Sequence, residues 1–169
     1  MGAAAVGMRP IVESAFCFMW VAMDSLVSQA SKMRYMFGGQ VDLPIVYRAS
    51  MYYDGSMAAH HSDRSYPLFM HIPGFKVVFP SNAYDAKGLF RRALTRNDPV
   101  MFLEHREILT SKTAVPEEDY EIEFGRAKVV REGTDVTVVA IARMVHHVLE
   151  VIDELAAEGI SVELIDPRT

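Results

Sequence analysis

Cysteine is nearly absent from this sequence of 169 residues, which also lacks basic runs and long apolar segments. Because Cys17 is the only cysteine, an intrachain disulfide and a thiolate metal cluster are excluded for these residues, which fits a reducing compartment. Lysine and arginine are scattered among acids, and the net charge is −5, so we expect no nucleic acid partner. The apolar stretch 15–23 is shorter than the ~20 residues of a spanning helix, so we expect no membrane partner.

Several motifs that define common enzyme classes are also missing. The sequence has no dinucleotide-binding glycine fingerprint, no phosphate-binding loop with Gly-Lys-Ser/Thr, no Gly-x-Ser-x-Gly elbow and no His-Glu-x-x-His zinc helix. Residues 1–10 show no charged segment before an apolar run, so no signal peptide is expected there. These absences remove support from four enzyme classes, and the fold class alone does not identify a reaction.

Short apolar segments alternate with amphipathic ones along the chain. The expected strands are residues 9–18, 44–47, 75–79, 99–103, 135–141 and 160–165, and the expected helices are residues 23–37, 66–71, 83–96 and 145–156. Such alternation is typical of parallel strands covered by helices. The sequence therefore predicts an α/β fold with a mostly parallel sheet and helices on both faces.

Residues 105–134 separate two such units. This segment is polar, rich in acids and without a clear period, so we interpret it as an inter-domain connection. Residues 3–6 resemble the last turn of a helix without its start, and the strand pair in 135–169 cannot bury both of its faces alone. We therefore expect both ends of the sequence to lie within folding units.

Two features could carry chemistry. His60 and His61 lie in a polar loop after an expected strand, where ligands collect in open parallel sheets. An imidazole there could exchange protons near neutral pH, or it could be a solvated loop side chain. Phe16, Phe18 and Trp20 alternate at the end of an expected strand, a pattern that fits either core packing or contact with a planar ligand.

Short sequence blocks spread over the whole chain resemble one family. The blocks are Gly7–Glu13, Gln29–Gly39, His60–Ser62, His71–Val78, Tyr84–Leu89, Asn97–Val100 and Ile165–Thr169. In this order they are similar to the β subunit of thiamine-diphosphate-dependent 2-oxo acid dehydrogenases, a family that includes the pyruvate, branched-chain and acetoin enzymes. The resemblance implies an N-terminally truncated pyrimidine-binding domain at 1–104, a connection at 105–134 and the truncated start of a transketolase C-terminal domain at 135–169.

The resemblance also implies partners and a cofactor. In such enzymes the α subunit binds the diphosphate and magnesium, the β subunit binds the aminopyrimidine, and the two form an α₂β₂ heterotetramer. The cofactor acts as the electron sink, and the acyl group passes to a lipoyl group on an acyltransferase partner. The compartment would be the bacterial cytoplasm, or the mitochondrial matrix in a eukaryote.

Site residues follow from the same resemblance. Phe18 matches the aromatic residue that packs against the aminopyrimidine, and His61 matches a loop histidine that protonates or stabilises intermediates. A monovalent-cation site, which potassium would fill, is implied at the backbone carbonyls of Ile45, Ala93, Leu94, Arg96 and Asp98. Carbonyl oxygens suit such a hard cation.

The sequence also departs from the family. A glycine-rich loop is replaced by residues 49–56, in which only Gly55 remains and Met51, Tyr52 and Tyr53 are bulky. The stretch 14–18 is one residue shorter than in common relatives, and the glutamate that activates the cofactor would lie upstream of Met1. We therefore expect residues 1–169 alone to be inactive.

Two hypotheses of function remain. The first is a subunit for oxidative decarboxylation of a 2-oxo acid, with pyruvate favoured and a branched-chain 2-oxo acid or acetoin as alternatives. The second is a non-catalytic assembly or interaction remnant that keeps the subunit interface without activating thiamine.

Overall fold

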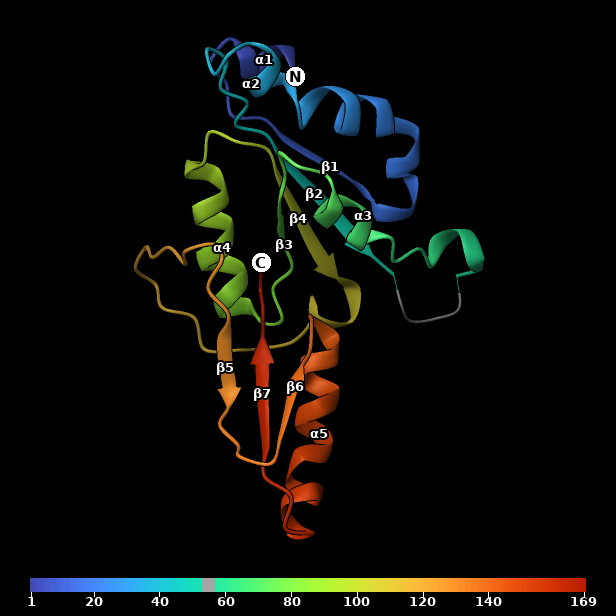
Figure 1. The fold of residues 1–169 in the computed structure, drawn as a ribbon, viewed down its shortest axis with the longest axis vertical. Helices are drawn as coiled ribbons and strands as arrows, with labels where there is room; N and C mark the ends of the chain where they lie inside the picture. Colours follow the sequence, from blue (N-terminus) through green and yellow to red (C-terminus); the bar gives the residue numbers. More distant parts are fainter. Residues whose placement is uncertain (53–56) are drawn as a thin grey trace.

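A computed structural model describes residues 1–52 and 57–169 (Figure 1). Its larger sheet contains four strands, β1 (Ile11–Ala15), β2 (Val46–Met51), β3 (Lys76–Val78) and β4 (Val100–His105). The strand order is β1-β2-β4-β3, and all three pairings are parallel. The prediction of an α/β fold with a mostly parallel sheet is confirmed.

Helical segments cover both faces of this sheet. Successive residues of a strand point to opposite sides, so each strand contributes apolar side chains to both faces. On one face, Met101 and Leu103 of β4 pack with Phe16 and other apolar side chains of the helical segments that follow β1. On the other face, Phe102 packs with Leu89 of α4 (Ala83–Thr95). The Oδ1 atom of Asn82 accepts a hydrogen bond from the Asp85 N–H at 2.9 Å and so caps the start of α4.

The start of the chain agrees with the prediction in part. The helical turn expected at residues 3–6 is present as α1 (Gly2–Ala5), but β1 ends at Ala15 rather than at residue 18. The single helix expected at 23–37 is divided into other segments. These are the 3₁₀ segment η1 (Phe16–Ala22), the π segment η2 (Asp24–Ala30) and α2 (Met33–Met36). The continuous apolar run 15–23 carries no period that distinguishes a strand from a helix.

The expected strand pattern of three alternating aromatic residues is therefore wrong. Phe16, Phe18 and Trp20 belong to a helical segment, so they point in different directions. Phe16 is buried in the core, whereas Phe18 and Trp20 are 53% and 41% exposed. Of the three aromatic residues, only Phe16 packs in the core.

The polar loop expected to contain His60 and His61 includes regular structure. Residues 49–51 belong to β2, and Ala59–His61 form a 3₁₀ turn, η3, before α3 (Tyr66–His71). Of the residues that depart from the family pattern, Met51 is buried in the core. Tyr53 and Gly55 lie outside the described residues.

A second sheet forms from the C-terminal part of the chain. Its strands are β5 (Lys128–Arg131), β6 (Val136–Val139) and β7 (Val162–Asp166), and α5 (Arg143–Ala157) connects β6 to β7. The parallel pairing of β6 with β7 agrees with the prediction. The segment 105–134, expected to lack regular structure, contains the 3₁₀ turn η4 (Arg106–Ile108) and β5, which pairs antiparallel with β7. A four-residue, mostly exposed strand shows too little alternation to be recognised.

The acidic segment before β5 lies against α4 instead of being solvated on all sides. Asp119 pairs with Arg91 at 2.7 Å, and Glu123 pairs with Arg92 at 2.8 Å. A Cβ atom on Gly88 would come within 2.7 Å of the side chain of Ile122, so glycine permits this close approach. The connection between the two sheets is therefore attached to the outer surface of α4.

A polar cluster joins the two sheets. The Ser81 hydroxyl donates to the Asp166 carboxylate at 2.6 Å, and the Arg168 backbone N–H donates to the same carboxylate at 3.0 Å. The Arg168 guanidinium donates to Asp85 at 3.1 Å, and His146 Nε2 lies 2.7 Å from the Ser81 carbonyl oxygen. Burial raises the pKa of Asp166, while the bond from Ser81 acts in the opposite direction.

We predict that Ser81→Ala destabilises the protein by about 1–3 kcal/mol, because the buried Asp166 carboxylate loses a donor. Urea unfolding measures this change. The comparison is Ser111→Ala, whose hydroxyl donates only to the Ile108 carbonyl in its own turn and is expected to cost less.

The loss depends on pH. The folded-state pKa of Asp166 is already raised above 3.8, and losing the donor raises it further. Stability from a raised acid pKa is present below the unfolded value and is lost as pH rises through the folded value. The Ser81→Ala deficit should thus grow as pH rises through the folded-state pKa of Asp166, which lies above 3.8, and a deficit that shrinks with rising pH contradicts the assignment.

Candidate functional site

The carboxyl ends of β1, β2 and β4 lie at one edge of the larger sheet, where open parallel sheets bind ligands. A pocket of about 410 Å³ lies at this edge, within the usual range for small-molecule sites. Residues from the ends of all three strands and from η1 and η3 line it. They are Ala15, Phe18, Ser50, Tyr52, Met57, His61, Arg106 and Leu109.

Phe18 and His61, the two side chains that the resemblance singled out, line this same pocket. Their rings meet edge to face, with 5.4 Å between centroids and an angle of 82°. Phe18 comes from η1 and His61 from η3, so the fold brings together residues that are far apart in sequence. Their roles in binding and catalysis stay predictions.

Neighbouring side chains orient His61. Its Nδ1 atom lies 3.7 Å from the Cys17 Sγ atom, and the His60 ring lies at 4.1 Å between centroids. Cys17 is buried, and burial raises the pKa of its thiol, which therefore stays neutral near neutral pH. Because the sulfur contact uses Nδ1, Nε2 is the nitrogen left to exchange a proton with a ligand.

Backbone strain lies just before this histidine turn. Ala58 precedes η3 with φ 66° and ψ 166°, a conformation that belongs almost entirely to glycine. Such a residue costs on the order of 1–3 kcal/mol, which the surrounding contacts must offset. One of these is the Ser62 hydroxyl, which donates to the Ala58 carbonyl at 3.0 Å. Strained backbone of this kind is concentrated at functional sites.

A polar contact attaches the histidine loop to η1. The Trp20 indole N–H donates to the Asp63 carboxylate at 2.6 Å. Arg106, from the turn after β4, lies over the Tyr52 ring at 5.1 Å from its centroid. Sequence patterns did not identify Cys17, Asp63 and Arg106 as site residues, because no spacing rule pairs residues from separate loops.

The five carbonyl groups predicted to bind a monovalent cation come from the opposite edge of the sheet. Ile45 and Asp98 precede β2 and β4, whereas Ala93, Leu94 and Arg96 lie at the end of α4. Four of these carbonyl oxygens, those of Ile45, Ala93, Leu94 and Arg96, accept hydrogen bonds from within the protein. The cation site stays a prediction.

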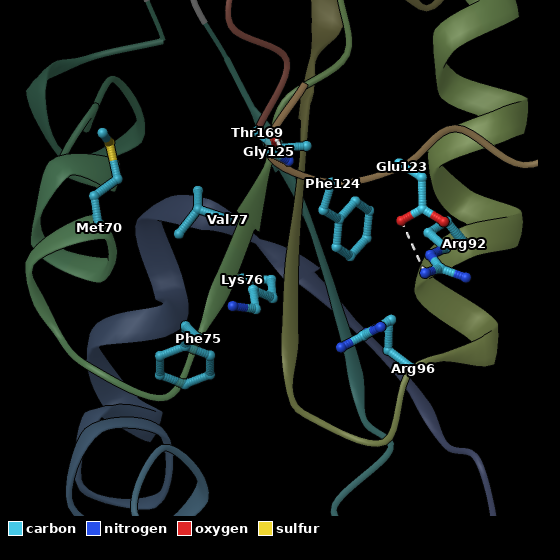
Figure 2. A pocket seen from close by; sticks show the side chains of 10 residues that line it. All are labelled: Met70, Phe75, Lys76, Val77, Arg92, Arg96, Glu123, Phe124, Gly125 and Thr169. Atoms are coloured by element: carbon cyan, nitrogen blue, oxygen red, sulfur yellow. Dashed lines mark hydrogen bonds and ion pairs between the residues drawn. The ribbon is translucent and has the colours of Figure 1, made fainter. Parts of the chain in front are cut away.

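A separate pocket of about 440 Å³ lies between α4, β3 and the segment before β5 (Figure 2). Lys76, Arg92 and Arg96 give it a cationic lining, and Glu123 pairs with Arg92. It contains neither Phe18 nor His61, and it lies away from the carboxyl edge of the sheet. In the described ranges 1–52 and 57–169, no three His, Cys, Asp or Glu side chains gather as metal ligands.

The domain comparisons agree with this architecture. The family described as "Transketolase, pyrimidine binding domain" matches residues 1–112, and "Transketolase, C-terminal domain" matches residues 125–169. The chain therefore belongs to the transketolase pyrimidine-binding domain family. Among the parts that the structure describes, no helix has both the length and the apolar character needed to cross a membrane.

Similar curated proteins include β subunits of an acetoin oxidoreductase, of pyruvate dehydrogenase and of 2-oxoisovalerate dehydrogenase. The acetoin:2,6-dichlorophenolindophenol oxidoreductase subunit beta of Cupriavidus necator is 50% identical over 100% of this chain and 50% of its own length. The pyruvate dehydrogenase E1 component subunit beta of Bacillus subtilis is 44% identical over 96% of this chain and 51% of its own. The 2-oxoisovalerate dehydrogenase subunit beta of the same organism is 42% identical over 100% of this chain and 52% of its own length.

The chain spans about half the length of the curated relatives it matches. A solved structure described as "Split gene transketolase, inactive beta4 tetramer" superposes with a TM-score of 0.79 and 25% identity, covering 98% of this chain and 51% of its own. The resemblance inferred from the sequence blocks is thus confirmed over the whole chain.

We predict that Trp20→Phe loosens the loop that carries His61. The phenyl ring keeps the apolar contact but removes the N–H that donates to Asp63. Hydrogen exchange of the amides at 58–63 should accelerate about 3–10-fold, as expected for a lost hydrogen bond of about 1 kcal/mol.

The matched control is Tyr35→Phe, which removes a hydroxyl from a ring that is 91% exposed. It should leave exchange in that loop unchanged. Equal exchange in Trp20→Phe and the unmodified protein would show that the Trp20–Asp63 contact does not hold the loop.

Proposed function

We propose that this chain forms part of the β subunit of a thiamine-dependent enzyme that decarboxylates a 2-oxo acid, or cleaves a related acyloin, and transfers the acyl group to a lipoyl partner. The observation that carries the proposal is the convergence of Phe18 and His61 on one pocket. Membership of the transketolase pyrimidine-binding domain family supports it.

The pocket has the character that a planar, polar cofactor ring requires. Phe18 is half exposed, so part of its ring is free to contact the aminopyrimidine of thiamine diphosphate. When bound, thiamine diphosphate supplies an electron sink for the carbon from which carbon dioxide leaves. We assign the diphosphate and magnesium to an α subunit, with the site completed at an α/β interface of an α₂β₂ heterotetramer.

His61 is proposed as the proton donor and acceptor of this chain. Imidazole is the side chain that most often acts as a general acid or base in enzymes. Contact with the neutral Cys17 thiol fixes the ring through Nδ1 and directs proton exchange to Nε2. Because His61 lines this pocket, we also assign it contact with an incoming lipoyl group.

The substrate proposal concerns pyruvate and acetoin first. Pyruvate was favoured from sequence blocks, but the 50% identity to the acetoin subunit exceeds the 44% identity to the pyruvate subunit. Acetoin is therefore a candidate equal to pyruvate, and a branched-chain 2-oxo acid is the third. Tyr52, which lies beneath Arg106 in the pocket lining, is the described residue best placed to separate these substrates by size.

The domain boundaries are part of the same proposal. We assign residues 1–104 to the pyrimidine-binding domain, 105–134 to the connection and 135–169 to the start of the C-terminal domain. The attachment of the acidic segment to α4 supports this division, because it fixes the path of the connection along the first domain.

The first activity test replaces His61 by alanine in the full-length β subunit assembled with its α subunit. Lipoyl-coupled turnover of pyruvate and acetoin should fall by roughly 100-fold or more, the usual effect of losing a general acid or base. His60→Ala, which alters the neighbouring ring, is expected to retain most of the activity. Unchanged turnover in His61→Ala would contradict the proposed role of His61 in proton transfer.

A second test concerns cofactor affinity. Phe18→Ala should weaken thiamine diphosphate binding roughly 3–10-fold, because an aromatic contact contributes about 0.5–1.5 kcal/mol beyond the area it buries. The control is Val21→Ala, whose side chain is 93% exposed in the same segment. Isothermal titration calorimetry of the assembled enzyme measures the affinity of each variant for thiamine diphosphate. Equal affinities contradict the assignment of Phe18, and no measurable binding by the unmodified enzyme favours a non-catalytic remnant.

A further inference from the structure

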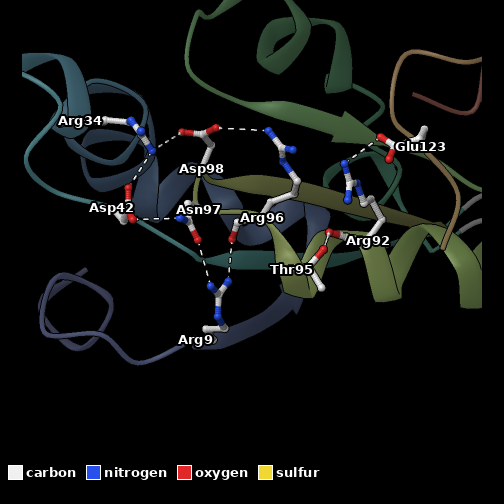
Figure 3. Close-up of polar contacts among 9 residues, drawn as sticks. All are labelled: Arg9, Arg34, Asp42, Arg92, Thr95, Arg96, Asn97, Asp98 and Glu123. Carbon is white, nitrogen blue, oxygen red and sulfur yellow. Dashed lines mark hydrogen bonds and ion pairs between the residues drawn. The ribbon is translucent and has the colours of Figure 1, made fainter. Parts of the chain in front are cut away.

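The end of α4 lies beside the residue that leads into β1. A helix leaves its last four carbonyl groups without donors from the helix itself, and these oxygens carry partial negative charge. Arg9, two residues before β1, donates hydrogen bonds to carbonyl groups at this helix end. Its Nη1 atom donates to the carbonyl oxygens of Leu94 at 3.0 Å and Arg96 at 2.8 Å. Its Nη2 atom donates to the Asn97 side-chain oxygen at 2.9 Å (Figure 3).

These contacts use the same oxygens that were predicted to bind a monovalent cation. Leu94 and Arg96 both direct their carbonyl oxygens at the Arg9 guanidinium. The Ile45 carbonyl accepts from the Val100 N–H at 2.9 Å, and the Ala93 carbonyl accepts from the Arg96 N–H at 3.3 Å. A positive charge with fixed donor directions is thus already present where the cation would be.

Further charges extend the contact across the amino ends of the strands. Asn97 donates to Asp42 at 2.9 Å, and Arg34 donates to Asp42 at 2.8 Å and to Asp98 at 3.3 Å (Figure 3). Arg96 lies 3.8 Å from the Asp98 carboxylate. Arg34 and Arg96 thus face the two carboxylates, Asp42 and Asp98, and Arg9 adds a third positive charge through its contact with Asn97. The cluster has a net positive charge, which opposes the entry of another cation.

We propose that the Arg9 guanidinium takes the place of the monovalent cation in this chain. It joins the carboxyl end of α4 to the entrance of β1, and it makes the stability of this edge independent of potassium. Arginine suits this role because its planar group donates to several acceptors at once and stays charged at all relevant pH values. Unlike a free ion, it is covalently attached and loses no translational freedom on binding.

The test compares thermal unfolding of the full-length subunit in its native assembly in potassium, sodium and tetramethylammonium chloride at equal ionic strength. The unmodified protein should unfold at the same temperature in all three salts. Arg9→Met should unfold about 2–6 °C lower in tetramethylammonium chloride, as expected for losing a charged group at a helix end. Part of this loss should return, with saturation, as potassium is added, because the carbonyl oxygens are then free to bind it.

The matched control is Arg131→Met, which removes an exposed ion pair with Asp153 on the second sheet. Its unfolding temperature should fall by less and show no response to potassium, since exposed ion pairs contribute little to stability. If Arg9→Met does not fold, Arg9→Lys replaces it. Lysine keeps the charge but not the planar group, so a smaller loss with the same potassium response is expected.

Three outcomes would overturn the proposal. One is saturable stabilisation of the unmodified protein by potassium over the other two salts. Another is an unfolding temperature for Arg9→Met equal to that of Arg131→Met in tetramethylammonium chloride. The third is a folded Arg9 variant that is destabilised but does not respond to potassium. None of these measurements depends on turnover or thiamine binding, so they test Arg9 separately from the proposed function.

Discussion

Parallel pairing of β4 with β2 on one side and β3 on the other is the constraint on which the rest of the structure depends. Parallel strands cannot be joined by short hairpins, so each connection crosses a face of the sheet and supplies the helices that cover it. The alternation of Met101, Phe102 and Leu103 in β4 then gives each face its own apolar core. All strands also end at the same edge, which decides where a pocket can form.

The two edges of the sheet consequently differ in chemistry. At the carboxyl edge, loops after β2 and β4 and the segment after β1 leave an open pocket lined by Phe18 and His61. At the amino edge, Arg9 and the charged residues around it close the gap between α4 and β1. One edge leaves side chains free to meet a ligand, while at the other Arg9 binds the carbonyl oxygens at the end of α4. A shift of β1 against β2 would disturb both.

Sequence patterns predicted the parts of the fold in which apolar periodicity is regular. The residues of α3 and α4 and the parallel pair β6–β7 follow such patterns closely. Sequence patterns did not predict the helical segment at 16–22, where every side chain is apolar. They also did not predict β5, whose pairing with β7 depends on distant residues. For the site, resemblance identified Phe18 and His61, and the fold places them in contact. Cys17 and the Trp20–Asp63 bond could not be predicted, because they join separate segments through space.

The bond between Trp20 and Asp63 spans 43 positions in the sequence and crosses from the first strand connection to the second. Contacts of such long range form only after the intervening chain has closed, and parallel sheets are slow to reach that point. The loop with His61 cannot take its final position until β1 and β2 have paired. During synthesis and refolding, therefore, the core of the larger sheet should appear before the pocket, and binding competence should lag behind the gain of secondary structure.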